Sequence, residues 1–179
     1  MSKQEDQKSK SQLRIVLVAP RIAANVGSIA RTCSALGAEL HLVRPFGFFL
    51  NEKEIRRASV GYWQDLQPVI YRDFEHFWKE FPGGPNCQIL WATKRGEAVY
   101  SEQSFSKDVL LIFGNEEEGV PKNFWEFSGL RQIVACRIPT LTVRCLNLGV
   151  SVAVIGFEVI RQWGKRLNFD QQLEGYGEA

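Results

Sequence analysis

The sequence lacks the features that mark several common classes of protein. It has only two histidines, and none of its four cysteines forms a C-x-x-C pair, which disfavours a zinc site. It contains no G-x-G-x-x-G fingerprint, Walker loop, G-x-S-x-G elbow or H-E-x-x-H helix. No apolar run reaches the roughly 18 residues of a membrane helix. The polar N-terminus also lacks the apolar core of a secretory signal.

A strong excess of one charge is also missing. The formal net charge is +2, and the sequence pI of about 8.4 is below the value above ~9 that is typical of a dedicated nucleic-acid-binding domain. Any contact with RNA would therefore come from local basic clusters rather than from global charge. We expect a cytoplasmic protein in which all four cysteines are free thiols; they are Cys33, Cys87, Cys136 and Cys145.

Short apolar runs alternate with helical patterns along the chain. The runs predict strands over residues 13–18, 40–43, 68–71, 88–92, 109–113 and 133–138. Asn25 is expected to cap a helix that ends at Gly37, and Asp73 and Asn147 are expected to cap two more, the last over 148–163. Shorter helices are predicted over 52–58 and after Pro121, with Phe124 and Trp125. This alternation implies an α/β fold, a mostly parallel sheet with helices on both faces.

The ends of the chain differ in composition from its middle. Residues 1–11 are rich in Lys, Gln and Ser and have no apolar residue after Met1, and residues 166–179 are polar and contain glycine. Such segments bury too little apolar surface to order themselves, although the N-terminal lysines could touch RNA. We therefore expect a single domain over residues 12–165 between two tails. The composition, 45% hydrophobic and 23% charged, suits one full-sized core.

Three segments each leave an apolar strand and enter a turn that contains Gly, Asn or Glu. They are residues 25–31 (Asn-Val-Gly-Ser-Ile-Ala-Arg), 113–121 (Phe-Gly-Asn-Glu-Glu-Glu-Gly-Val-Pro) and 138–147 (Ile-Pro-Thr-Leu-Thr-Val-Arg-Cys-Leu-Asn). Ligand sites in open α/β sheets lie outside the carboxyl ends of strands. The three turns are therefore candidate walls of one pocket.

The polar residues of the first two turns leave two interpretations open. Arg31 points away from the apolar face centred near Ile29, so it is either a solvated side chain or one held at a pocket mouth to contact a phosphate or a reacting hydroxyl. The three consecutive Glu at 116–118 either form a solvated turn with Gly at positive φ or offer a carboxylate to a ligand or to Arg31.

The third turn and the helix after it are also ambiguous. Residues 139–147 are either a buried irregular loop, whose backbone groups a ligand such as adenine would satisfy, or an ordinary surface loop. The following helix is apolar on most sides, which suits a central core position or a subunit interface. His41 and His76 lie in strand and helix patterns, where structural or exposed roles are more common than catalytic ones.

In order and content, the three segments resemble the motifs of the SpoU branch of the SPOUT, or α/β-knot, RNA methyltransferases. The chain most resembles the small tRNA (cytidine(34)-2'-O)-methyltransferases. The resemblance runs from about residue 13 to 163 and includes Lys-Glu-Ile-Arg-Arg-Ala-Ser at 53–59, Gly61-Tyr62 and Ala-Thr-Lys-Arg-Gly at 92–96. It implies a C-terminal deep trefoil knot, a homodimer without a metal or a membrane, and tRNA as the partner.

The resemblance also implies the reaction. A methyl group from S-adenosylmethionine would go to the 2'-oxygen of wobble nucleotide 34, leaving S-adenosylhomocysteine. The family's motifs match Arg31, Glu116 and Asn147 as catalytic residues, with Arg31 activating or positioning the hydroxyl or its phosphate. A solvated guanidinium is a poor base, so activation by RNA phosphate or a neighbouring group is required.

Cofactor and RNA contacts follow from the same resemblance. The cofactor-binding residues it implies are Ala92, Thr93, Gly96, Gly114, Asn115, Ile138, Cys145 and Leu146. The RNA-binding residues it implies are Asn25, Lys53, Arg56, Arg57, Lys94 and Arg144.

The sequence departs from the family pattern at several positions. The motif-three Ser-Leu-Asn-Leu-Ser is replaced by residues 145–149, Cys-Leu-Asn-Leu-Gly, so both Ser hydroxyls are lost. Phe157 stands where the wobble enzymes often have Tyr. Asn115 stands where the wobble enzymes usually have Pro, and in having Asn there the chain resembles the tRNA guanosine-18 branch. Two alternatives therefore stay open: 2'-O-methylation of another tRNA or rRNA site, or a non-catalytic RNA-binding knot protein.

Overall fold

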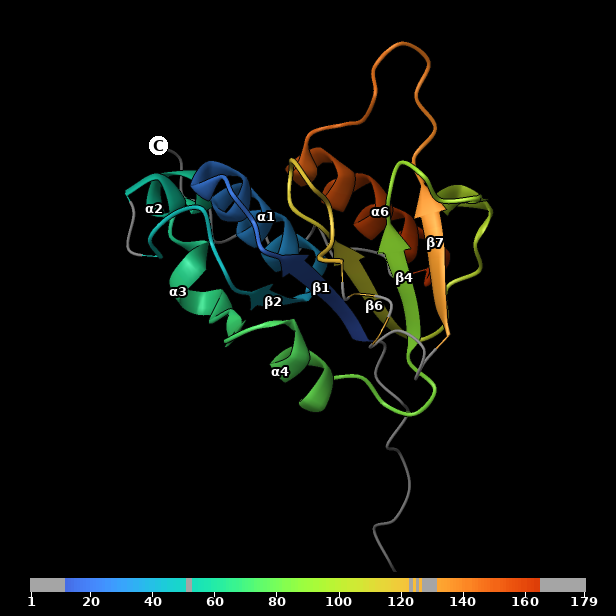
Figure 1. The fold of residues 1–179 in the computed structure, drawn as a ribbon, viewed down its shortest axis with the longest axis horizontal. Coiled ribbons are helices and arrows are strands. Elements are labelled where there is room, and N and C mark those ends of the chain that lie inside the picture. Colours follow the sequence, from blue (N-terminus) through green and yellow to red (C-terminus); the bar gives the residue numbers. More distant parts are fainter. Residues whose placement is uncertain (1–11, 51–52, 123, 125, 127–131, 165–179) are drawn as a thin grey trace, which may run out of the picture.

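The computed structural model describes residues 12–50, 53–122, 124, 126 and 132–164. A seven-stranded sheet in the order β3-β2-β1-β6-β4-β7-β5 organises them (Figure 1). Every strand pairing in this sheet is parallel, which confirms the predicted α/β class. The strands are β1 (Gln12–Val18), β2 (Glu39–Val43), β3 (Val69–Tyr71), β4 (Gln88–Ala92), β5 (Ala98–Val99), β6 (Asp108–Phe113) and β7 (Ile133–Arg137).

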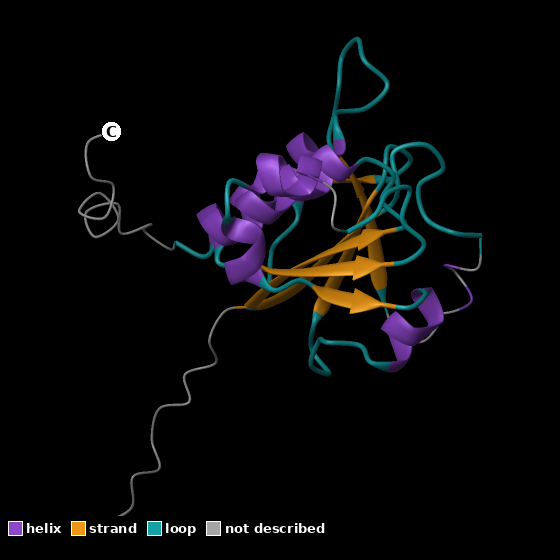
Figure 2. Cartoon of the chain, turned by 90° about the vertical axis from the view of Figure 1, so that its left-hand side faces the viewer, coloured by secondary structure: helices purple, strands orange, loops and turns teal. Residues whose placement is uncertain are grey.

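Helices cover both faces of this sheet (Figure 2). The longest are α1 (Ala23–Leu36) and α6 (Leu148–Gln162), which pack on the same face and contact each other. The shorter helices are α2 (Lys53–Ser59), α3 (Tyr62–Leu66), α4 (Phe74–Lys79) and the 3-10 helix η1 (Tyr100–Glu102). Alternate residues of each central strand point to opposite faces of the sheet and belong to two hydrophobic cores. Ile15 and Leu17 pack under α1 and α6. Val16 and Val18 pack with the aromatic side chains of α4.

Most predicted helix ends are confirmed, and one is wrong. Gly37 ends α1 with a left-handed φ of 62°, Asp73 caps α4 through the His76 N–H, and Asn147 caps α6. Asn25, however, is not the cap of α1: the N–H groups of Asn25 and Val26 already bond to the carbonyl of Ile22, which makes Ile22 the N-cap. The side chain of Asn25 is therefore available for other contacts.

Some predictions concern residues that the structure does not describe, and some observed elements were not predicted. The two tails and Trp125 lie outside them, and Phe124 is buried. The short elements α3, β5 and η1 were not predicted. Within the described residues, no helix is long and apolar enough to cross a membrane. The trefoil knot stays a prediction from the family resemblance.

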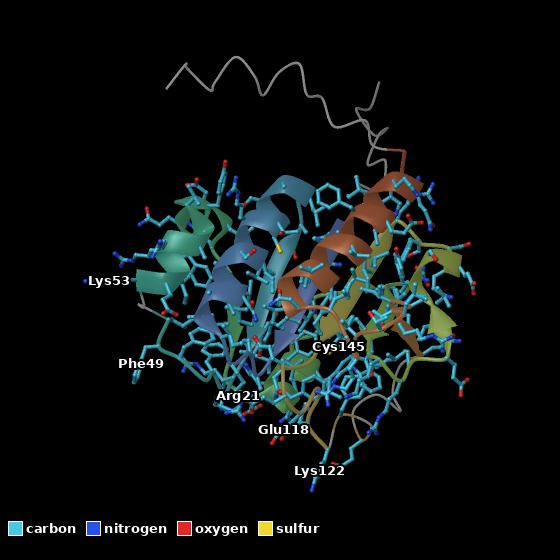
Figure 3. All side chains as sticks on the ribbon, turned by 90° about the horizontal axis from the view of Figure 1, so that it is seen from above. Arg21, Phe49, Lys53, Glu118, Lys122 and Cys145 are labelled. Atoms are coloured by element: carbon cyan, nitrogen blue, oxygen red, sulfur yellow. The ribbon has the colours of Figure 1, made fainter. Side chains whose placement is uncertain are left out.

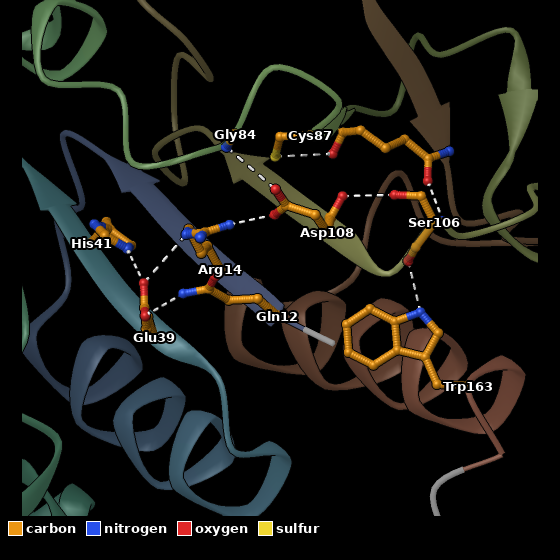
Figure 4. Close-up of polar contacts among 10 residues, drawn as sticks. Gln12, Arg14, Glu39, His41, Gly84, Cys87, Ser106, Asp108 and Trp163 are labelled. Atoms are coloured by element: carbon orange, nitrogen blue, oxygen red, sulfur yellow. Dashed lines mark hydrogen bonds and ion pairs between the residues drawn. The ribbon is translucent and has the colours of Figure 1, made fainter. Parts of the chain in front are cut away.

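An ionic cluster around the buried Arg14 side chain stabilises the amino-terminal edge of the sheet (Figure 4). Arg14 of β1 is 4% exposed and forms ion pairs with Asp108 of β6 and Glu39 of β2. Asp108 also accepts the backbone N–H of Gly84, and Glu39 contacts His41. These contacts tie three neighbouring strands together at the edge opposite the predicted site, which suits a structural role.

Candidate functional site

Three neighbouring strands end at the same level of the sheet. Ala92, the last residue of β4, pairs with Phe113 of β6 on one side and with Cys136 of β7 on the other. The Thr93 N–H continues this contact by donating to the Cys136 carbonyl at 2.8 Å. The loops after β4, β6 and β7 therefore begin side by side, as the parallel arrangement predicts.

Two glycines allow these loops to approach closely. A Cβ added at Gly96 would lie 2.5 Å from the carbonyl carbon of Cys136, and one added at Gly114 would lie 2.2 Å from that of Gly119. Both contacts are with backbone atoms, which cannot rotate away as a side chain can. Any larger residue at either position would displace a loop of the candidate site.

The acidic segment after β6 folds as a closed turn. The backbones of Asn115 and Gly119 exchange two hydrogen bonds, and Gly119 has a φ of 81°. The Asn115 side-chain oxygen accepts the N–H groups of Glu117 and Glu118 at 2.9 and 2.6 Å. The predicted turn with glycine at positive φ is thus confirmed, and Asn115, where the wobble enzymes usually have Pro, helps to hold it closed.

Hydrogen bonds from one buried side chain join the three motif segments. Asn25 of α1 donates through Nδ2 to Glu116 Oε1 at 2.8 Å, and its Oδ1 accepts from Asn147 Nδ2 at 3.0 Å. Glu116 Oε2 accepts the backbone N–H of Arg21 at 2.9 Å, and Asn147 Oδ1 accepts the first N–H groups of α6. We refer to the two side-chain bonds of Asn25 as the Asn25 bridge.

Arg31 lies on α1 six residues after Asn25, and its side chain is exposed, as predicted. Among the described residues it makes no hydrogen bond or ion pair. Glu117 and Glu118 are exposed too, and Glu116 bonds to the Arg21 backbone and Asn25. The alternative in which a glutamate of this turn holds Arg31 therefore does not apply in this structure, and the Arg31 guanidinium is left accessible at the surface.

The loop between β7 and α6 is a surface loop. It extends away from the sheet (Figure 1), and Leu141, Val143, Arg144 and Cys145 are exposed. Thr140 Oγ1 donates to the Val143 carbonyl at 2.7 Å, so part of the loop satisfies its own backbone. The interpretation of residues 139–147 as a buried loop is wrong here, and the surface alternative holds. Ile138 and Leu146, at its two ends, are half-buried.

The cysteines differ in exposure. Burial raises the pKa of the Cys136 thiol to about 11 and raises that of Cys33 further still. Cys145 is exposed in the loop before α6, and none of the four cysteines forms a disulfide. The residue that replaces the family Ser is therefore the most accessible of these thiols.

Basic side chains occur on the elements around this edge. Lys53, Arg56 and Arg57 are exposed on α2, and Lys94 is exposed in the loop after β4. Helix α2 packs tightly on α1 because Gly27 has no side chain: a Cβ there would lie 2.7 Å from Ala58 Cβ. This packing brings the basic residues of α2 to the helix that bears Arg31.

One predicted RNA contact does not fit its surroundings, and one nearby residue was missed. Asn25 is only 9% exposed and both ends of its amide are bonded within the protein, so it is not an RNA contact in this structure. Arg21 was not predicted, yet its backbone N–H holds Glu116 and its side chain is exposed at the rim (Figure 3). The sequence feature that could have identified Arg21 as a site residue is its position directly after Pro20, just past the end of β1.

Two other features of the described residues bear on function. No group of three or more His, Cys, Asp or Glu side chains there is placed to hold a metal ion. An open depression of about 840 Å³ lies near Trp78, Cys87 and Gln88. It sits at the amino-terminal ends of β4 and β7, opposite the Asn25 bridge, so it is not part of the candidate site.

Comparison with known proteins agrees with this geometry. A Geobacillus stearothermophilus protein named as a tRNA (cytidine(34)-2'-O)-methyltransferase is 38% identical over 154 residues, covering 84% of this chain and 94% of that protein. A structure solved in work on 2-OH methylation of C/U34 on tRNA is 34% identical with a TM-score of 0.78, covering 87% of this chain and 99% of the other. An AdoMet-bound rRNA methyltransferase from Sinorhizobium meliloti is 28% identical with a TM-score of 0.70, covering 86% of this chain and 57% of that one. Together with the match of residues 12–157 to the SpoU rRNA Methylase family, these similarities confirm the predicted family: the chain belongs to the SpoU methylases.

Proposed function

We propose that this protein transfers a methyl group from S-adenosylmethionine to the ribose 2'-oxygen of tRNA, at wobble nucleotide 34. The observation that supports it most directly is the convergence of three motif segments at one edge of the sheet, joined by the Asn25 bridge. Its similarity to proteins named for this activity selects tRNA and nucleotide 34.

The residues at this edge fit a nucleoside cofactor. The loops after β4, β6 and β7 offer backbone donors and acceptors, and half-buried Ile138 and Leu146 offer apolar surface. This combination suits an uncharged adenine better than a phosphate group. S-adenosylmethionine, when bound, supplies an activated methyl group. We assign its binding to Ala92, Thr93, Gly96, Gly114, Asn115, Ile138, Cys145 and Leu146.

Arg31 is assigned to the substrate. Its exposed guanidinium is a cation that can contact an RNA phosphate and stabilise negative charge on the reacting 2'-oxygen. Glu116 and Asn147 use their polar atoms within the protein. Their role is therefore to fix the loop after β6 and the start of α6, so that the reacting groups meet in one geometry.

RNA and a second copy of the chain are the proposed partners. Lys53, Arg56 and Arg57 on α2, with Lys94 and Arg144 near the loops, supply positive charge for phosphates. On α6, Val150 and Phe157 are 48% and 44% exposed, which is unusual for an apolar helix and suits contact with a second copy in a homodimer. Because tRNA is the substrate, we place the enzyme in the cytoplasm.

Substitution of Arg31 tests the assignment. Arg31→Ala is expected to abolish methylation of unmodified tRNA, while calorimetry shows unchanged binding of S-adenosylhomocysteine. Arg161→Ala, which removes an exposed arginine paired with Glu158 near the far end of α6, is the matched control and is expected to keep activity. Normal turnover by Arg31→Ala would refute the assignment.

Two alternatives have specific observations behind them. Asn115 stands where the wobble enzymes usually have Pro, which favours a different RNA site, and mapping of the methylated nucleoside decides between sites. The missing Ser hydroxyls of residues 145–149 favour a non-catalytic RNA-binding protein. Absence of S-adenosylhomocysteine binding at millimolar ligand would support that second alternative.

A further inference from the structure

We propose that Asn25 is a positioning residue whose carboxamide works in only one orientation, with its NH₂ group toward Glu116 and its oxygen toward Asn147. This inference rests on the proposed function, since it concerns the geometry of the same site. It replaces the RNA contact predicted for Asn25 with a contact inside the protein.

The two neighbours set this orientation independently. An ionised carboxylate can only accept hydrogen bonds, so Glu116 requires the NH₂ of Asn25 at the 2.8 Å contact. Asn147 Oδ1 already accepts from the N–H groups of Gly149 and Val150, at 2.8 and 3.4 Å, so the group it turns to Asn25 is its NH₂. The Asn25 oxygen must then face Asn147, at 3.0 Å. Each neighbour alone therefore predicts the same placement of oxygen and nitrogen.

The Asn25 bridge connects parts of the site that are far apart in sequence. Glu116 belongs to the turn after β6, Asn147 caps α6, and Asn25 belongs to the helix that bears Arg31. The contacts span 91 and 122 residues of sequence. Since Asn25 is 9% exposed, water replaces a lost contact poorly. Loss of the bridge is thus expected to loosen the turn and the start of α6 relative to α1.

Asn25→Asp tests the orientation because it changes a donor into an acceptor with almost no change in shape. At high pH the introduced carboxylate would face Glu116 across the 2.8 Å contact, and two carboxylates that close repel each other. At lower pH one shared proton restores the hydrogen bond, while the other oxygen still accepts from Asn147. The variant is therefore expected to recover as the pH falls, with the two carboxyls titrating as a pair.

Other charges around the bridge are mostly exposed and do not reproduce this behaviour. Those on α1 and the adjoining loops include Arg21, Arg31, Glu117, Glu118 and Arg144; those on the helices packed against α1 are Lys53, Glu54, Arg56, Arg57, Asp65, Glu158 and Arg161. Glu158 is largely buried but pairs with Arg161. The wild type contains all of these groups, so the difference between variant and wild type isolates the introduced carboxyl.

The experiment compares Asn25→Asp and Asn25→Ala with the wild type between about pH 5 and pH 8. The matched control is Asn86→Asp, the same exchange at an exposed position near the opposite edge of the sheet. Thermal unfolding is followed by circular dichroism, and S-adenosylhomocysteine affinity by calorimetry. Methylation of tRNA near neutral pH gives kcat and KM.

For Asn25→Asp we expect an affinity loss of about tenfold or more at the highest pH, recovering most of the way to wild type at the lowest. Its unfolding temperature, relative to wild type, should recover in the same pH range, whereas Asn25→Ala should be impaired throughout and Asn86→Asp should match wild type. An Asn25→Asp variant equal to wild type at all pH values, or impaired equally at all of them, would overturn the proposal. Unfolding needs no ligand, so this readout tests the bridge even if the wild type fails to methylate tRNA.

Discussion

Replacement of Asn147 by alanine removes two kinds of contact at once. Its Oδ1 caps α6 through the Gly149 and Val150 N–H groups, and its Nδ2 donates to Asn25. The first group of contacts stabilises the helix start, and the second belongs to the Asn25 bridge. Both losses lower the free energy of unfolding, and the second also releases the helix start from α1.

The expected magnitude follows from these contacts. Loss of an N-cap side chain costs about 0.5–2 kcal/mol, and leaving the part-buried Asn25 oxygen without its donor costs about 1 kcal/mol more. A total of roughly 1.5–3 kcal/mol lowers the unfolding temperature of a domain of this size by roughly 3–12 °C. The affinity for S-adenosylhomocysteine is expected to fall as well, because the loop before α6 loses its anchor.

Thermal unfolding followed by circular dichroism, together with calorimetry, checks both parts. Asn147→Asp keeps a capping oxygen but loses the donor to Asn25, so it should lose less stability than Asn147→Ala while losing comparable affinity. Asp73→Ala removes the cap of α4, away from the site, and should lose stability without losing affinity. Wild-type stability and affinity in Asn147→Ala, beside a clear loss of stability in Asp73→Ala, would refute the reasoning.

Three further results are expected. Gly114→Ala places a Cβ 2.2 Å from the Gly119 backbone, so calorimetry should show weaker S-adenosylhomocysteine binding; unchanged affinity would contradict this. Burial lowers the pKa of His41 below its ordinary 6.5, so stability to urea should decline as pH falls below that value, and His41→Asn should flatten the decline. Hydrogen bonds from Arg161 lower the pKa of Glu158 to about 2. The stabilisation of the fold by this ion pair is therefore present above about pH 4.5 and lost toward pH 2. In Arg161→Ala, NMR titration should show a higher pKa for Glu158.

The sequence predicts the sheet well because its strands are buried runs of β-branched and aliphatic residues. β1 and β6 are central and match their predicted ranges to within one residue. The gathering of the motif loops also follows from sequence, since parallel strands place their carboxyl ends at one edge. Short elements such as α3 and β5 were missed because five and two residues give too little periodic pattern.

The contacts of the site were harder to predict. Asn25 satisfies the local rule for a helix cap, yet the chain turns into α1 three residues earlier and leaves that side chain for Glu116 and Asn147. A capping rule considers only the next few residues, whereas these partners are 91 and 122 positions away. The family motifs identify the residues that matter, but the hydrogen bonds that join them become visible only in the folded chain.

The most direct test of the account uses radiolabelled S-adenosylmethionine, the purified full chain and bulk unmodified tRNA, followed by mapping of the labelled nucleoside. We expect label on the 2'-O-methyl group of the wobble nucleotide, and no label with Arg31→Ala. Label at another ribose would keep the chemistry and contradict the assigned nucleotide. Failure to label any RNA, together with no binding of S-adenosylhomocysteine, would contradict the central claim that this SpoU family member is a methyltransferase.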